Sequence, residues 1–115
     1  MYQFSYSEVL HDNCLDARER ERQALDRCIE LMQRAERSGP RSRDTIEAVH
    51  LTRQLWTFFI DDLGNTENSL PEKLRADLIS IGVWTLKEVE AIRIGKSSNW
   101  RAVIDICTAV RDGLN

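Results

Sequence analysis

Residues 70–95, with the sequence LPEKLRADLISIGVWTLKEVEAIRIG, decide the fold, because their pattern is that of one long helix. Pro71 suits the first turn of a helix, where a backbone N–H is not needed, and Gly95 suits the left-handed residue that ends one. We therefore predict a helix over residues 71–94 and expect it to be the most buried helix of the chain. Its main apolar face contains Leu74, Leu78, Ile81, Trp84, Val89 and Ile92.

The middle of this predicted helix is apolar on more than one side. Ile79, Val83 and Leu86 form a second stripe, at i, i+4 and i+7, beside the main face. Gly82 lies here too, although glycine costs about 1 kcal/mol relative to alanine in a helix interior. We interpret Gly82 as a point where a neighbouring helix approaches the backbone closely.

Three further segments with helical periodicity flank this one, and turn residues separate them. Gly39-Pro40 is expected to end the first helix, Ser42 to cap the second and Ser98 to cap the last. Because the connecting loops are short, successive helices are expected to pack antiparallel. The sequence thus predicts an all-α fold, a single up-down bundle of about four helices within residues 16–113. The expected helices cover residues 16–37, 43–63, 71–94 and 99–112.

The helix predicted over residues 43–63 has more apolar surface than one bundle face requires. Leu51, Leu55 and Phe58 form a second stripe with the same i, i+4, i+7 spacing. This stripe lies beside a main face that by itself would fill the core side of the helix. The main face contains Ile46, Val49, Trp56, Ile60 and Leu63.

Residues 1–14 are set apart from the bundle as an N-terminal aromatic arm. Tyr2, Phe4 and Tyr6 alternate with polar residues, a period of two that is typical of extended backbone. A lone strand has no partner in an otherwise helical chain, so an extended arm is predicted, with a helix that starts at Ser7 as the alternative. Its three aromatic residues favour docking, either on the chain's own bundle or on a second molecule.

The composition is that of one folded domain over residues 1–115. The chain is 42% hydrophobic and 30% charged, with a formal net charge of −3. A single core is expected, with Trp56, Trp84 and Trp100 in it or at its edge. There is no signal-peptide pattern and no apolar run of about 20 residues, and three widely spaced cysteines favour reduced thiols. We therefore expect a cytoplasmic protein without membrane insertion.

Residues with catalytic or metal-binding chemistry do not form a recognisable motif. His11 and His50 are isolated, and no Gly-rich phosphate loop or metal-ligand spacing occurs. Asp61 and Asp62 are adjacent on a predicted helix, so their side chains diverge by about 100° instead of converging on one bond. The sequence predicts no enzyme activity, no bound metal and no cofactor.

Arginines are concentrated in the first half of the chain, which is the one feature that favours nucleic-acid binding. Residues 1–53 contain nine arginines, but they also contain ten Asp and Glu residues. Interleaved acids make a poor footprint for phosphates. The sequence therefore disfavours direct RNA binding.

The two extra apolar stripes carry more information about function. Either they face each other or the N-terminal arm within the monomer, or they form a groove or a homodimer surface. A groove would take an amphipathic helix of a partner, and the arm would lie over it in the free protein. The candidate binding residues are Leu51, Leu55, Phe58, Ile79, Val83 and Leu86, with Tyr2, Phe4 and Tyr6.

Six segments resemble the FlaF family of flagellar biosynthesis regulators from alphaproteobacteria. They are MYQFSYSEVL, ARERERQALDRCIELM, GPRSRD, LWTFFIDDL, LPEKLRADLISIGVW and RDGL, and they run in order from residue 1 to residue 114. The fifth is the most specific. The resemblance implies a small cytoplasmic helical protein needed for flagellin production, with no catalytic residues and no residue-level binding motif.

The resemblance also implies partners. One is flagellin, which a member of this family would hold before export as a chaperone, because the amphipathic helices at the ends of flagellin are buried only in the filament. Another is FlbT, a regulator of flagellin translation. The alternative to a flagellin chaperone is a post-transcriptional regulator that acts on flagellin mRNA directly or through FlbT. A homodimer also remains open.

Overall fold

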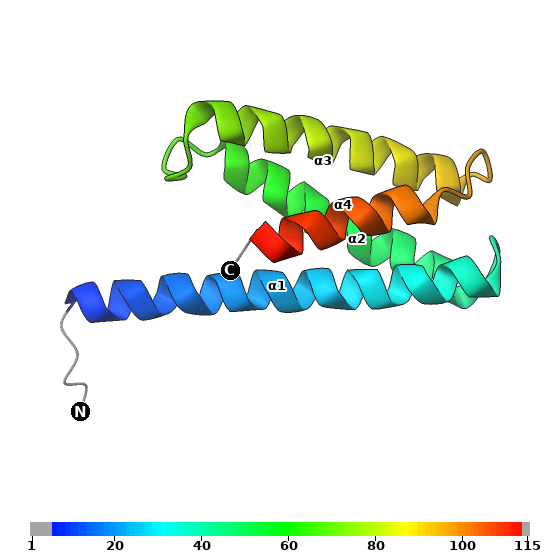
Figure 1. The fold of residues 1–115 in the computed structure, drawn as a ribbon, viewed down its shortest axis with the longest axis horizontal. Helices are drawn as coiled ribbons and strands as arrows, with labels where there is room; N and C mark the ends of the chain where they lie inside the picture. Colours follow the sequence, from blue (N-terminus) through cyan, green and yellow to red (C-terminus); the bar gives the residue numbers. More distant parts are fainter. Residues whose placement is uncertain (1–5, 114–115) are drawn as a thin grey trace.

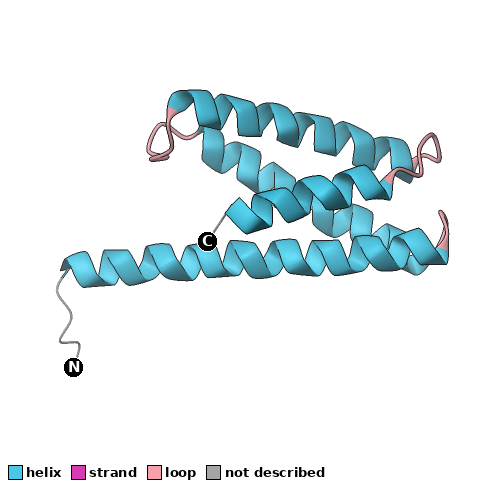
Figure 2. Ribbon diagram, viewed as in Figure 1, coloured by secondary structure: helices cyan, strands magenta, loops and turns pink. Residues whose placement is uncertain are grey.

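Four α-helices follow one another in a computed structural model of the chain, which describes the backbone of residues 6–113 and the side chains of residues 17–113. Each helix is antiparallel to the one before it, and the described part contains no strand (Figures 1 and 2). The predicted all-α up-down bundle is confirmed. The helices are α1 (Tyr6–Ser38), α2 (Arg43–Gly64), α3 (Glu72–Arg93) and α4 (Trp100–Gly113).

The predicted start of the first helix is wrong, because α1 begins at Tyr6 and not near Asp16. Residues 6–16 contain no glycine or proline to stop a helix. The extended arm can therefore cover residues 1–5 only, which lie outside the described part. In Figure 1 the first turns of α1 project beyond the other three helices.

The turns between the helices follow the predicted chemistry at most positions. Gly39 and Gly95 have φ angles of +97° and +81°, the left-handed region that favours glycine. The Ser42 hydroxyl accepts a hydrogen bond from the Thr45 amide at 3.2 Å, so Ser42 caps α2 as expected. The cap of α4 is not Ser98, because the Ala102 amide donates to the Asn99 side-chain oxygen at 3.3 Å.

The core lies where α1, α2 and α4 meet. Leu25, Cys28 and Met32 of α1 are fully buried there, together with Val103 and Cys107 of α4. The indole N–H of Trp56, on α2, points to the Cys107 sulfur at 3.4 Å. Trp56 and Trp100 are only 1% and 3% exposed, so both lie in the core as predicted.

The helix expected to be the most buried, α3, is in fact the most open. Its buried residues are Gly82, Thr85, Val89 and Ile92, whereas Trp84 is 39% exposed and lies outside the core. A 22-residue helix is about 33 Å long, and the 14-residue α4 about 21 Å, so α4 is too short to cover all of α3. Figure 1 shows α3 and α4 diverging from their shared loop.

The close contact predicted at Gly82 is confirmed. A Cβ atom added to Gly82 would lie 2.9 Å from Ile60 Cγ1 and 3.0 Å from the Trp56 ring. This contact turns the Gly82–Thr85 side of α3 toward α2 and turns other apolar residues of the predicted main face away. The predicted main face of α2 is also wrong at one position, because Ile46 is 64% exposed.

Candidate functional site

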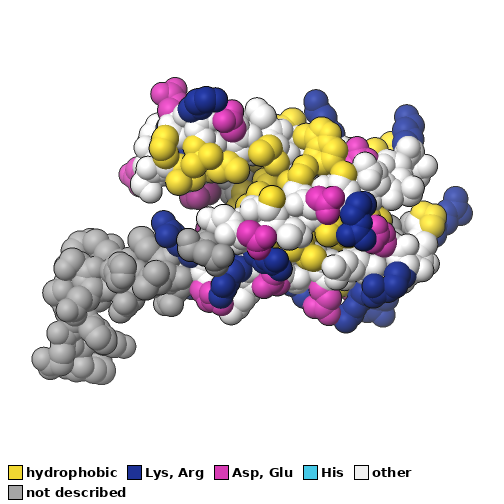
Figure 3. Space-filling model, viewed as in Figure 1, with side chains coloured by type: hydrophobic (Ala, Val, Ile, Leu, Met, Phe, Trp, Pro, Cys, Tyr) yellow, Lys and Arg dark blue, Asp and Glu magenta, His cyan; other side chains and the backbone are white. Residues whose placement is uncertain are grey.

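Large apolar side chains lie uncovered along the first part of α3. Leu74, Ile81 and Trp84 are each between a third and a half exposed, and Leu70, just before the helix, is similar. We call these four residues the open face. Figure 3 shows hydrophobic side chains gathered over α3 and toward α4. Such a contiguous patch marks a docking surface more often than isolated exposed residues do.

A small apolar hollow adjoins the open face. It has a volume of about 110 Å³. Leu70 belongs to both the open face and the hollow, and Leu78 lies one helical turn from Leu74 and Ile81, so the two surfaces are continuous. All four helices contribute to the lining, which consists of Glu21, Trp56, Phe59, Asp62, Leu63, Asn68, Leu70, Leu78 and Val110.

The size of the hollow limits what it can hold. Pockets for drug-sized ligands have volumes of roughly 300–1,000 Å³, well above that of this hollow. A dry cavity of about 150 Å³ lined by Leu, Ile and Phe is large enough for benzene. The hollow therefore suits a single apolar side chain, inserted from a partner that lies over the open face.

The loop between α2 and α3 holds the hollow in shape. The side-chain Nδ2 of Asn68 donates hydrogen bonds to the backbone oxygen and to the carboxylate of Asp62. The backbone N–H of Leu70 donates to Asn68 Oδ1 at 3.0 Å. The Arg75 guanidinium donates to the carbonyl oxygens of Leu63 and Asn65, both at 3.3 Å. These bonds satisfy carbonyls at the end of α2 and fix Leu63 and Leu70 in the lining.

Two carboxylates stand at the edge of the hollow, Glu21 on α1 and Asp62 on α2. Burial raises the pKa of Glu21 above its usual value, and the nearby Asp62 charge raises it further. The Arg18 and Arg20 charges oppose this shift but do not cancel it. Two acidic side chains therefore border the apolar hollow, and one of them is partly buried.

The binding residues expected from the sequence are only partly at the surface. Leu51, Leu55 and Leu86 are half-buried and pack against the core, and Ile79 is half-buried as well. Phe58 and Val83 are exposed, at 58% and 40%. Tyr2 and Phe4 lie outside the described residues, and Tyr6 is described by its backbone alone.

The structure places the α2 stripe against α1. Leu55 and Phe58 line a second hollow, of about 190 Å³, with Ala17, Arg20, Glu21 and Ala24. No residue of the α3 stripe lines it, so this hollow does not bring the two predicted stripes together. Glu21 lines both hollows, and they adjoin at this residue.

Sequence reasoning missed Leu70 and Val110 as candidate site residues. It placed Leu74 and Ile81 on the main apolar face of a buried helix, and Trp84 in the core or at its edge. Periodicity identifies an apolar face but not whether another helix covers it. The predicted helix lengths did indicate that part of the third helix would be uncovered, because a helix over 99–112 is too short to cover a helix over 71–94.

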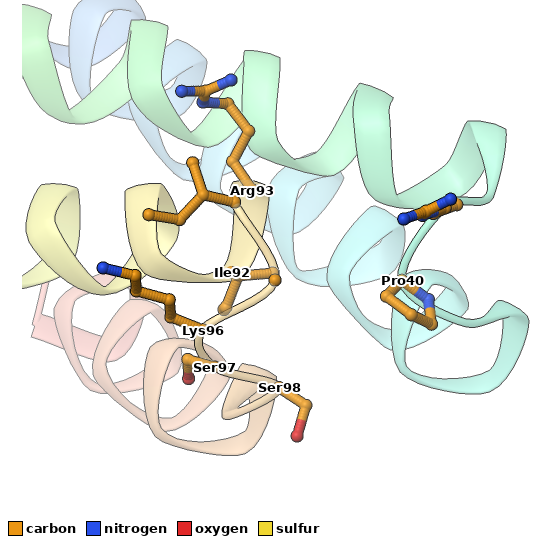
Figure 4. Close-up of a pocket in the computed structure, with 9 residues that line it drawn as sticks. Pro40, Ile92, Arg93, Lys96, Ser97 and Ser98 are labelled. Carbon is orange, nitrogen blue, oxygen red and sulfur yellow. The ribbon is translucent and has the colours of Figure 1, made fainter.

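A wider concave region near two of the loops lacks an apolar hollow of this kind. It has a volume of about 540 Å³ and lies between the α1–α2 and α3–α4 loops. Figure 4 shows that the Lys96 and Arg93 side chains do not converge on a common point. Arg93 is already paired with Glu90, and the Ser97 hydroxyl donates to Glu88. The basic side chains that line this region therefore do not form an anion-binding site.

The two cysteines within the described side chains, Cys28 and Cys107, are free and buried. Burial raises the pKa of Cys28 to about 12, and the neighbouring Cys107 contributes. Burial likewise raises the pKa of Cys107 to about 11. Within the described residues no group of His, Cys, Asp or Glu has metal-binding geometry, and no helix is long and apolar enough to cross a membrane.

Comparison with known proteins gives one match. No curated protein and no solved structure matches the chain. The model of one protein family, described as flagellar protein FlaF, matches residues 2–114, which is nearly the whole chain. The chain therefore belongs to the FlaF family of flagellar proteins.

Proposed function

We propose that this protein promotes flagellin production by holding an amphipathic helix of unassembled flagellin in the cytoplasm, as a secretion chaperone. The observation that carries the proposal is the open face of α3, where four large apolar side chains lie uncovered beside a hollow. Family membership supports the flagellar role. The open face supports the mode of action, which is binding and not catalysis.

The spacing of the open face suits a helical client. Leu74, Leu78 and Ile81 lie at i, i+4 and i+7 on one side of α3, and Trp84 follows one turn later. An amphipathic helix presents its own apolar residues at the same spacing, so two such faces can pack along their length. One client side chain would fill the hollow, and its neighbours would cover the open face.

The second hollow extends the proposed binding surface. It adjoins the first at Glu21 and includes the exposed ring of Phe58. A client helix longer than the open face would reach it. The residues Leu51, Ile79, Val83 and Leu86 and the N-terminal residues Tyr2, Phe4 and Tyr6 remain proposed contacts.

The same binding would couple flagellin export to flagellin translation. A protein with a client on its open face presents a different surface from the free protein, because the apolar residues become covered. A translational regulator such as FlbT could read that difference. Free flagellin would then be reported to the translation machinery through the occupancy of its chaperone.

Direct binding to flagellin mRNA has less support. Many arginines of α1 and α2 already have acidic partners, such as Arg22 with Glu19 at 2.6 Å and Arg34 with Glu30 at 2.7 Å. On the face in Figure 3, Lys and Arg side chains lie among Asp and Glu side chains along α1. Neutralised arginines release few counterions from a nucleic acid and contribute little affinity.

A binding experiment with two ligands tests the proposal. Purified protein is titrated with purified flagellin and, separately, with the flagellin leader transcript, at low and at moderate salt. We expect flagellin to bind and the complex to survive moderate salt, because apolar burial is not screened. Binding to the transcript alone, lost as salt rises, would overturn the proposal in favour of an RNA regulator.

A matched pair of variants assigns the binding to α3. Ile81→Asp places a charge on the open face, and Ser80→Asp places the same charge on an exposed neighbouring position. We expect Ile81→Asp to weaken flagellin binding at least tenfold and Ser80→Asp to leave it nearly unchanged. Equal affinities of the two variants would place the site elsewhere.

A further inference from the structure

The acidic residues of α1 with described side chains differ in whether they form an ion pair with an arginine. Between residues 17 and 38, Glu19, Asp26, Glu30 and Glu36 each form an ion pair with an arginine. Glu21 is the exception, because it has no hydrogen bond or ion pair with any residue whose side chain is described. It is also the one that borders the apolar hollow.

Asp62, the other carboxylate that borders the hollow, also lacks an ion pair within the described residues. Its carboxylate accepts a hydrogen bond from the neutral Asn68 side chain at 3.2 Å, and no described arginine or lysine forms an ion pair with it. It lies near the C-terminus of α2, where the helix dipole disfavours a negative charge, and the last turn of α2 has no basic residue. The free protein thus has two carboxylates beside the hollow, and neither forms an ion pair with a described basic residue.

We infer that Glu21 and Asp62 select the partner helix, by accepting a lysine or arginine that lies one turn from the apolar side chain filling the hollow. The occupant is a partner protein's amphipathic helix with a basic residue beside its apolar stripe. A cation placed there would neutralise both carboxylates at once. The inference deepens the proposed function, since it specifies the chemistry of the helix that the open face binds.

The geometry suits a long basic side chain. The rim of the hollow is acidic while its interior is apolar, with Leu63, Leu78 and Val110 in the lining. Lysine and arginine can pack their methylene groups against such a surface and hold the charged end at its edge. The positive charges of Arg18 and Arg20 on α1 lower the pKa of Glu21. Their effect is smaller than the increase caused by burial and by the Asp62 charge.

The first test uses stability alone. The raised pKa means that folded Glu21 binds a proton more tightly than unfolded Glu21, so its charge destabilises the fold at pH 7 and stops doing so once pH falls to where it is protonated. We expect Glu21→Gln to raise the melting temperature at pH 7, with the gain shrinking toward pH 4. The control Glu30→Gln removes the same charge from an ion pair and should give no gain.

The second test uses two synthetic helical peptides as probes. Both carry the same leucine stripe, and they differ in having lysine or glutamate one turn from the central leucine. We expect the wild-type protein to bind the lysine peptide about fivefold more tightly, as for one exposed charge pair. The double variant Glu21→Gln with Asp62→Asn should lose this preference, and Glu21→Lys should reverse it.

The outcomes separate this inference from the proposed function. Equal affinity of the wild-type protein for the two peptides, or no binding of either, would overturn the inference even if flagellin binds. A lysine preference that is unchanged in the double variant would also overturn it. If the preference is present and depends on Glu21 and Asp62 while flagellin itself fails to bind, only the proposed function fails.

Discussion

At the scale of single residues, a small side chain determines how α3 lies on α2. A helical projection gives most weight to large apolar residues, and it predicts that Trp84 and Ile81 face the core. The structure instead brings α2 against Gly82, because only the absence of a Cβ atom allows Ile60 and Trp56 to come so near. The sequence indicated that Gly82 was a close contact, but not that the contact would turn the larger residues outward.

Replacing Gly82 tests this contact. Gly82→Leu gains about 1 kcal/mol of helix propensity but must displace Ile60 and the rigid Trp56 ring, and overpacking of this kind costs about 1–3 kcal/mol or more. We expect a clearly lower melting temperature. The control Ser80→Leu, at an exposed position of the same helix, should not lower it. A Gly82→Leu protein as stable as the wild type would contradict the packing of α2 on α3.

The buried cysteines give a second prediction at this scale. With pKa values of about 12 and 11, Cys28 and Cys107 have almost no thiolate at pH 8, and burial also excludes reagents. In a Cys14→Ser variant, we expect both thiols to react with a disulfide reagent only as fast as the protein unfolds. Urea should make the reaction fast. Rapid labelling without urea would show that the core is more accessible than described.

At the scale of the helices, four elements and most of their ends could be predicted from the sequence. Glycines, proline and Ser42 mark turns by local backbone chemistry, which does not depend on the rest of the fold. The start of α1 could not be placed in this way, because alternating aromatic residues favoured an extended arm. Burial of α3 could not be predicted either, since it depends on how far α4 reaches along its neighbour.

Two of the three tryptophans, Trp56 on α2 and Trp84 on α3, measure this difference in burial between the helices. Trp56 is 1% exposed, so Trp56→Ala should cost about 3–5 kcal/mol and leave little folded protein. Trp84 is 39% exposed on the open face, so Trp84→Ala should cost only about 1–2 kcal/mol. Thermal unfolding of the two variants compares them directly. Equal losses of stability would mean that α3 is buried as the sequence suggested.

At the scale of the whole molecule, the bundle has a closed side and an open side. The closed side, where α1, α2 and α4 meet, holds most of the buried residues and provides stability. The open side exposes apolar residues of α3, and two carboxylates that form no ion pair with a described basic residue lie at its edge. An uncovered apolar surface of this kind suits the proposed binding of an amphipathic helix.

Hydrogen exchange of α3 during flagellin binding tests the central claim most directly. In the free protein the backbone of residues 72–84 should exchange faster than that of residues 25–35 of α1, because few buried contacts hold this part of α3. Adding saturating flagellin should slow exchange in residues 72–84 and in the 65–70 loop, with little change in residues 43–50. Flagellin binding that leaves exchange in residues 72–84 unchanged would contradict the account.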